Sequence, residues 1–415
     1  MEGDFMSHEV KLFGLSAESG RWIYVILGLI MCVCLGAVYA YSIFLAPVRE
    51  AFQVSAFLGN LPFMVFLAFF SILMFFGGRI MEKLGPRKLS IIGGVIVGLG
   101  WLLSAFAPNI WALTLTYGVI AGSGVGLVYG CPVAMGAKWF PDKKGLAVGL
   151  ILAGFGGSAL ITGKVASELL PSVGLAATFM YFGIAFGIIL FLLSLPFRFP
   201  SAGWAPAGWK PAAGAVVASD FAPGEMVKTS TFWGLFLCFL IGSIAGLMAI
   251  GISKPVGSEI IKITGETAAT LVGIFAIFNA LGRPLFGFLT DKIMPRNAAL
   301  LNLFLILVVS VIMIIAKEGD TGLYTMGFIG FWLCLGGWLA IAPTATAAFF
   351  GMVNYARNYG VVFFAYGLGA IVGGIISGQA KDVFGTYTVA FYPTAVLAIV
   401  AMALAFVLLK PPKKA

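Results

Sequence analysis

The chain has 415 residues, of which 61% are hydrophobic and 10% charged, and its mean hydropathy is +1.06. These values exclude a soluble globular protein and predict an integral membrane protein. The net charge of +9 could suggest a nucleic-acid partner, but the basic residues lie in the polar segments between apolar blocks, so we expect none.

Apolar blocks of about twenty residues recur along the chain, each long enough to cross a hydrocarbon core of about 30 Å. A β-barrel would instead show short alternating strands, so the pattern predicts an all-α membrane protein. The first block has no A-x-A-like cleavage site, and we expect no cleaved signal peptide. The twelve predicted transmembrane helices are 22–46, 57–78, 89–107, 110–136, 145–168, 174–197, 231–253, 267–289, 298–316, 322–348, 359–380 and 386–409.

The distribution of positive charge sets the expected orientation. With both termini in the cytoplasm, eighteen of the 25 lysines and arginines fall on the inner side, as the positive-inside rule requires. The short loops favour a bacterial inner membrane, and we expect a monomer in the lipid bilayer. The six on the outer side are Arg49, Lys164, Lys254, Lys262, Lys317 and Lys381.

The longest connection, residues 198–230, is rich in proline and divides the chain into halves of six predicted helices. This composition predicts an irregular cytoplasmic linker between an N-terminal bundle, 1–197, and a C-terminal bundle, 231–415. Its tryptophans, Trp204 and Trp209, are expected to rest on the headgroup layer.

The loop after the second helix of each half has the same form. GRIMEKLGPR at 78–87 matches GFLTDKIMPR at 287–296, 209 residues later, with Met294 in place of the second glycine. The equal offset indicates duplication. The pattern resembles the signature of the major facilitator superfamily, which implies two six-helix bundles and alternating access. Acid–base pairs at this loop would close a cytoplasmic gate, formed by Gly78, Glu82, Lys83, Arg87, Asp291, Lys292 and Arg296.

One cation, Arg283, lies inside the eighth predicted helix. An arginine in mid-membrane costs about 2.5–3.5 kcal/mol on the insertion scale, so it should face protein or water and have a partner. No acid lies near it in its helix, whereas Asn279 shares its face. A planar guanidinium fits a carboxylate through two parallel hydrogen bonds, which favours an anionic substrate. Alternatively, Arg283 binds helix carbonyls and braces the bundle.

Three motifs narrow the resemblance to the branch of monocarboxylate transporters and oxalate/formate antiporters: NALGRP at 279–284, KWFPDKKGLA at 138–147 and ARNYG at 356–360. In that branch the eighth-helix arginine anchors the carboxylate, which implies this role for Arg283. Two positions depart from it. Tyr366 replaces the antiporter's eleventh-helix lysine, and Asn279 replaces an aspartate of animal monocarboxylate transporters.

One cation matches one carboxylate, so we expect a lactate- or pyruvate-like substrate. A dianion such as oxalate would leave a buried charge uncompensated, at a cost of several kcal/mol. Tyrosines supply an apolar wall and a hydroxyl together. Tyr39 and Tyr129 align with cavity positions of the antiporter. The predicted substrate-binding residues are Arg283, Asn279, Tyr39, Ser42, Tyr129, Trp338, Phe364 and Tyr366.

We expect no enzyme, cofactor or metal site. The five cysteines match no metal or redox spacing, His8 is the single histidine, and no nucleotide loop occurs. Transport must use gradients, and proton symport is expected, with substrate neutralising Arg283 so that the protein can change conformation. Uniport and oxalate/formate-type exchange remain open, as do a non-transporting anion sensor and a channel. Lys164 with Glu168, and Lys381 with Asp382, are expected to be exposed pairs on a solvated edge.

Overall fold

The computed structural model describes residues 11–201, 204–206 and 220–412, and helices make up nearly all of it. A two-stranded hairpin precedes the first helix. The elements of the first half are β1 (Lys11–Leu12), β2 (Leu15–Ser16), α1 (Ala17–Leu35), η1 (Gly36–Ala40), α2 (Tyr41–Phe52), α3 (Ala56–Ser104), α4 (Ile110–Leu113), η2 (Thr114–Ala121), α5 (Gly122–Trp139), α6 (Lys144–Gly156) and α7 (Ser158–Ser194).

The second half repeats this plan after a short helix. Its elements are α8 (Pro223–Met226), α9 (Ser230–Pro255), η3 (Val256–Ile260), α10 (Gly265–Ile315), α11 (Thr321–Phe350), α12 (Tyr355–Phe384), η4 (Tyr387–Ala390) and α13 (Phe391–Leu408).

Over the described residues, nine continuous helical stretches are long and apolar enough to cross a membrane. Three of them, 56–104, 144–194 and 265–315, have 49, 51 and 51 residues. At 1.5 Å per residue each would be about 75 Å long, more than twice the hydrocarbon thickness. Each contains a residue whose φ is positive and not helical, at Gly85, Gly174 and Met294. Division there gives the twelve spans that the hydropathy predicts.

The duplicated loop has the same backbone shape in both halves. Gly85 has φ 75° and ψ 165°, and Met294 has φ 72° and ψ 152°. Side chains rarely adopt this region, which is nearly exclusive to glycine. The second loop therefore keeps the backbone turn of the first although Met294 replaces the glycine, and the backbone of Met294 is strained.

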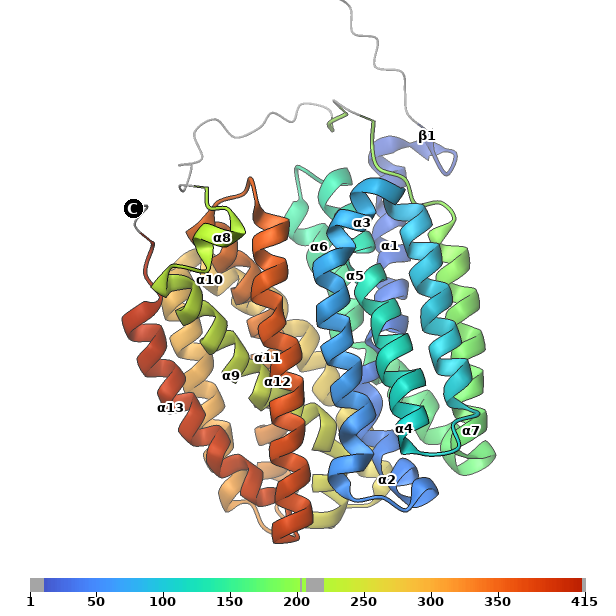
Figure 1. The fold of residues 1–415 in the computed structure, drawn as a ribbon, viewed down its shortest axis with the longest axis vertical. Helices are drawn as coiled ribbons and strands as arrows, with labels where there is room; N and C mark the ends of the chain where they lie inside the picture. Colours follow the sequence, from blue (N-terminus) through green and yellow to red (C-terminus); the bar gives the residue numbers. More distant parts are fainter. Residues whose placement is uncertain (1–10, 202–203, 207–219, 413–415) are drawn as a thin grey trace, which may run out of the picture.

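Figure 1 shows the helices of the first half on one side of the molecule and α9–α13 on the other. The hairpin, α8 and the described C-terminal end lie at one end, here named the linker face. The segments α2 and α4 lie at the other end, here named the opposite face. Every membrane span therefore runs between these two faces.

The ends of the linker are packed against the bundles. The ring of Trp204 lies 4.8 Å from Trp139, and Trp139 Nε1 donates to the carbonyl of Arg198 at 2.8 Å. At the other end, Asn358 Nδ2 donates to the carbonyl of Phe221 at 3.0 Å. Trp204 therefore packs against protein, whereas the sequence predicted that it would rest on the lipid headgroups. Trp209 lies outside the described residues.

Glycines bring helices into close contact between the two halves. A Cβ added to Gly367 would lie 2.7 Å from Ser71 Cβ, and one at Gly378 would lie 2.6 Å from Phe57 Cα. Both neighbours belong to α3, so α12 and α3 approach without intervening side chains. Ser71 Oγ also donates to the carbonyl of Phe363 at 2.8 Å. Small residues allow such close packing in membranes.

Candidate functional site

Arg283 lies in α10 and is only 4% exposed. None of its three guanidinium nitrogens meets hydrogen-bond geometry with a described residue, although the Tyr129 side chain lies near enough for a weaker contact. Arg283 also belongs to none of the ion pairs found in that part of the chain. The guanidinium carbon lies 5.8 Å from the centre of the Phe155 ring. Cation–π attraction alone does not satisfy five N–H donors. The structure therefore contains a buried cation with unused donors.

Three tyrosines gather around this cation from different helices. Tyr39 belongs to η1, Tyr129 to α5 and Tyr366 to α12, and all three side chains lie near Arg283. The hydroxyls of Tyr39 and Tyr366 share a hydrogen bond of 2.7 Å, which joins the first half of the chain to the second. The sequence-predicted residues Arg283, Tyr39, Tyr129 and Tyr366 thus come together.

Phenylalanine rings close the walls of this cluster. The Phe155 ring meets Tyr39 edge-on at 5.2 Å and Tyr129 edge-on at 5.3 Å. The Phe70 ring lies 5.7 Å from Phe155, 5.2 Å from Tyr129 and 5.9 Å from Tyr366. Such edge-to-face contacts are the favoured geometry for aromatic pairs. The cluster is therefore apolar on its walls and polar at the guanidinium and the hydroxyls.

Helix irregularities place Tyr39 and Phe155. The first span changes to a 3₁₀ turn over Gly36–Ala40, and the fifth span breaks at Gly157 between α6 and α7. A Cβ on Gly36 would lie 2.5 Å from the Phe155 carbonyl oxygen, so glycine is required for this approach. Short 3₁₀ segments inside a helix often mark a functional hinge.

Two predicted residues lie near the cluster but have structural contacts. Asn279 is fully buried, and its Nδ2 donates to the Trp332 carbonyl at 2.9 Å, which ties α10 to α11. Its Oδ1 has no partner in the described chain and faces Gly156 of the other half. Trp338 stacks on Phe239, with ring centres 6.0 Å apart, and its Nε1 likewise finds no partner among those residues.

Phe364 and Ser42 are not brought to the cluster. Phe364 packs on Phe75, at 5.3 Å, on another side of α12. Helical geometry explains this placement, because residues two apart point to different faces while residues three apart share one. Phe363 is the ring that joins the cluster, at 4.9 Å from Tyr366. Ser42 is fully buried, and its hydroxyl has no hydrogen-bond partner within the described ranges.

The rings that sequence reasoning missed are Phe70, Phe155 and Phe363. Phe363 could have been found, because it lies three residues before Tyr366 on the same helix face. Phe155 is flanked by glycines on both sides in GFGG at 154–157, which indicates close helix contact but does not identify the partner helix. Phe70 has no comparable signal in a chain that is 14% aromatic.

At the linker face, the predicted gate loops carry no ion pair. Glu82, Lys83, Arg87, Asp291 and Lys292 are exposed, and no salt bridge joins any of them to another described residue. Two further gate residues, Gly78 and Arg296, are half-buried, and Arg296 lies over the Phe406 ring at 4.5 Å. The acid–base pairs expected here are not formed in this conformation.

Within the described residues, one ion pair joins the two halves at the opposite face, and a second ion pair shares its carboxylate. Glu259 of η3 lies 3.7 Å from Arg49 of α2 and 2.5 Å from Lys381 of α12. Asp382 accepts hydrogen bonds from the backbone N–H groups of Ala56 and Phe57 at 2.8 and 2.9 Å, capping α3. The expected exposed pair of Lys381 and Asp382 was therefore wrong, because each residue contacts another helix. Their sequence offered no sign of partners so distant along the chain.

The other expected surface pair is present. Lys164 Nζ lies 3.6 Å from Glu168 Oε1, and the side chains are 77% and 67% exposed. This pair lies within a single helix, one turn apart, where exposed ion pairs contribute little. The Lys164–Glu168 pair can therefore serve as a control for the Arg49–Glu259 pair, which joins the two halves.

The KWFPDKKGLA motif has a structural role at the linker face. Arg21 of α1 donates two hydrogen bonds to Asp142, at 2.6 and 2.8 Å, and a third to the Trp139 carbonyl at 3.0 Å. Arg21 also lies 4.5 Å from the Phe140 ring centre. The hydrogen bonds from Arg21 hold the pKa of Asp142 below its ordinary value. The motif thus fastens the loop between α5 and α6 to the start of α1.

Comparison with known proteins agrees with this architecture. The family model described as Major Facilitator Superfamily matches residues 26–353. The oxalate:formate antiporter of Oxalobacter formigenes is 34% identical over 393 residues, covering 93% of this chain and 90% of the relative. Monocarboxylate transporter 13 of Rattus norvegicus is 27% identical, covering 76% of this chain and 71% of the relative.

Among solved structures, a bacterial homolog to the human lysosomal transporter Spinster, in an inward-facing and unoccupied conformation, has a similar fold. It aligns with a TM-score of 0.72 at 16% identity, over 95% of this chain and 98% of that chain. This likeness concerns the fold alone, whereas the family match spans most of the sequence. The chain therefore belongs to the Major Facilitator Superfamily and is a multi-pass membrane transporter, not an enzyme.

Proposed function

We propose that the protein carries a small monocarboxylate, of the lactate or pyruvate kind, across a bacterial inner membrane. The proposal includes cytoplasmic termini, because the basic residues gather in the segments of the linker face. In this proposal, the bundles 1–197 and 231–415 move relative to one another about the linker 198–230. The substrate site lies between them at Arg283.

The observation that carries the proposal is the unpaired guanidinium of Arg283. It is 4% exposed and has no hydrogen-bond partner in the described chain, an arrangement that is costly unless a ligand completes it. A carboxylate offers two oxygens in one plane, which match the guanidinium fork. The alternative of a bracing arginine requires hydrogen bonds to helix carbonyls, and none is found among the described residues.

The surroundings of Arg283 favour a small, partly apolar acid. The hydroxyls of Tyr39, Tyr129 and Tyr366 can donate to the carboxylate or to a 2-hydroxyl or keto oxygen. The rings of Phe70 and Phe155 suit a methyl group. We assign supporting roles to Asn279, which fixes α10 against α11, and to the free Trp338 Nε1.

Charge balance separates this substrate from a dicarboxylate. Within the described residues of the cluster, Arg283 is the one cation, and Tyr366 is neutral at physiological pH. A second carboxylate would enter without a cation to meet it, and the buried charge would cost several kcal/mol. The binding site therefore prefers monoanions in this proposal.

The substrate also supplies the coupling in this scheme. A buried cation without a partner raises the free energy of the state in which the site is closed on both sides. Binding of a carboxylate neutralises this charge and so lowers the barrier to the conformational change. The proton then travels on an acid at the rim, because the substrate stays ionised when it neutralises Arg283. Proteoliposomes provide the test: lactate uptake that alkalinises the external medium supports proton symport.

A second candidate is anion exchange, favoured by the 34% identity to a protein named as an oxalate:formate antiporter. The same vesicles discriminate between the two. In the counterflow arm, labelled lactate accumulates against trapped unlabelled lactate in either case, and fails to do so for a non-transporting sensor. Strict one-for-one exchange without a pH change would reject proton symport and favour the exchanger.

A further inference from the structure

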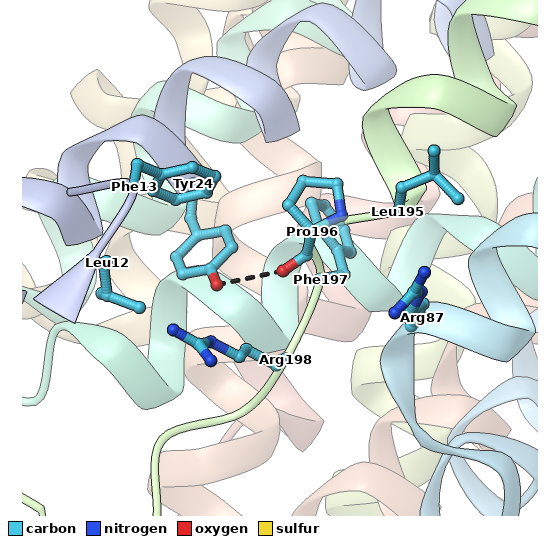
Figure 2. A pocket seen from close by; sticks show the side chains of 8 residues that line it. All are labelled: Leu12, Phe13, Tyr24, Arg87, Leu195, Pro196, Phe197 and Arg198. Atoms are coloured by element: carbon cyan, nitrogen blue, oxygen red, sulfur yellow. Dashed lines mark hydrogen bonds between the residues drawn. The ribbon is translucent and has the colours of Figure 1, made fainter. Parts of the chain in front are cut away.

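A pocket opens at the linker face within the first half of the chain, away from Arg283. Figure 2 shows it between the hairpin, α1, the part of α3 that follows Gly85, and the segment after α7. Its volume is about 260 Å³, the size for a small polar group. Its lining residues are Leu12, Phe13, Tyr24, Arg87, Leu195, Pro196, Phe197 and Arg198.

The pocket carries two guanidinium groups and no carboxylate among its lining residues. Arg198 Nη2 donates to the Lys11 carbonyl at 3.1 Å, and its guanidinium lies beside the Tyr24 hydroxyl, so only its remaining N–H groups are available to a ligand. Arg87 is exposed, and its side chain makes no hydrogen bond or ion pair with the rest of the described chain. Each guanidinium can donate to the oxygens of a phosphate.

Aromatic and apolar side chains form the other side of the pocket. Tyr24 donates its hydroxyl to the Pro196 carbonyl at 3.0 Å, which fixes the wall (Figure 2). The Phe13 ring meets the Tyr24 ring edge-on at 5.2 Å while remaining 44% exposed. Leu15, on the same hairpin, is 48% exposed. An apolar rim beside a cationic pocket, at the end of membrane helices, suits a ligand with a charged head and an apolar tail.

The second half repeats this construction. A pocket of about 590 Å³ lies between the start of α9 and the end of α13, and its lining includes Lys228 and Lys410. Thr231 donates to the Lys410 carbonyl at 2.7 Å, as Tyr24 donates to Pro196. Glu225 also lines this pocket, and its carboxylate accepts from the Ala222 N–H at 2.8 Å. A basic pocket between the first and last helices is thus common to both repeats.

We propose that the pocket of the first half binds the phosphate of an anionic phospholipid, with Arg87 and Arg198 on the phosphate oxygens and Phe13 against the glycerol and acyl part. Because the pocket joins the ends of the first, third and sixth spans, the bound lipid fastens the first bundle at the linker face. Arg87, predicted as a gate residue, acts here as a lipid ligand. The proposal is independent of the transported substrate.

The test titrates purified full-length protein with a short-chain phosphatidylglycerol and follows the thermal unfolding temperature. Inorganic phosphate and a short-chain phosphatidylcholine form the other two arms. The double variant Arg87→Gln/Arg198→Gln is expected to bind the phosphatidylglycerol about tenfold more weakly than the wild type. Lys88→Gln is the matched control, because Lys88 is exposed beside Arg87 but does not line the pocket, and its affinity should change by less than about twofold.

The arms also identify the source of the phosphate. Stabilisation by phosphatidylglycerol alone indicates a lipid, whereas equal stabilisation by inorganic phosphate indicates a soluble ligand of the same chemistry. Equal losses in the double variant and in Lys88→Gln would overturn the proposal, because general surface charge would then explain the binding. If the double variant does not fold, the single Arg87→Gln change at an exposed side chain tests the same point, with an expected loss of about threefold.

Discussion

The ion pair that joins the two halves at the opposite face is expected to hold that side of the transporter closed. Glu259 contacts Arg49 in the other half of the chain and Lys381 in its own half. The side chains are 29%, 32% and 23% exposed for Arg49, Glu259 and Lys381, so water screens them in part. The Arg49–Glu259 pair joins the two halves and contributes about 0.5–1 kcal/mol to closure, whereas the Lys381–Glu259 pair lies within the second half.

Glu259→Gln keeps the shape of the side chain and removes its charge. Loss of about 0.5–1 kcal/mol from the closed form shifts the conformational equilibrium by roughly twofold to fivefold toward opening at the opposite face. The matched control is Glu168→Gln, which removes the same charge from a pair within a single helix, with Lys164. That variant should leave the equilibrium unchanged.

Spin labels on cysteines introduced at Glu50 and Val383 report the change as a distance distribution across the opposite face. Both positions are exposed, on α2 and α12, and the five native cysteines are buried and will not label. We expect the longer-distance population to grow in Glu259→Gln and to stay constant in Glu168→Gln. Identical distributions in the two variants would refute the reasoning, because the ion pair between the halves would then contribute nothing to closure.

Three further predictions concern stability, and thermal unfolding of the purified protein measures each. Met294→Gly should raise the unfolding free energy by about 1 kcal/mol, since it relieves a φ of 72° at a side chain that is 59% exposed; a lower unfolding temperature would contradict this. Asp142→Asn should cost about 2 kcal/mol, because it removes one of the two acceptors of Arg21 and the negative charge that strengthens the other hydrogen bond. Folding lowers the pKa of Asp142, so the stability that its carboxylate contributes is present above pH 3.8 and is lost as the pH falls through the pKa of the folded state. The Asp142→Asn variant should not show this loss of stability in acid. The same loss in the wild type and the variant would exclude this explanation. Gly36→Ala should lower the unfolding temperature by forcing α1 away from α6, whereas Gly149→Ala, with open space at its Cβ, should not; equal effects would argue against the close contact.

The sequence allowed the helical spans to be predicted because hydropathy over about twenty residues is a strong and local signal. The fused helices do not contradict it, since the breaks at Gly85 and Met294 coincide with the polar loops. Arg283 could be identified for a similar reason, because a cation inside an apolar block stands out without knowledge of its neighbours.

Residues whose role depends on packing could not be identified in this way. Phe363 and Phe364 are adjacent residues of the same type, so the sequence does not distinguish them. The rotation of α12 about its axis decides which one packs on Tyr366. Glu259 and Lys381 are far apart in the sequence and meet because two helices end at the same face. A single sequence carries no record of such pairs, so the opposite-face contacts appear in the structure alone.

The central claim is that Arg283 binds a single carboxylate. Uptake of labelled lactate into cells that express the protein tests it most directly, with oxalate as competitor and Arg283→Ala as the variant; Lys164→Gln serves as a control for the loss of a surface charge. The account predicts that Arg283→Ala abolishes uptake, that Lys164→Gln retains it and that oxalate leaves it unchanged. Uptake that persists in Arg283→Ala, or strong competition by oxalate, would contradict the account.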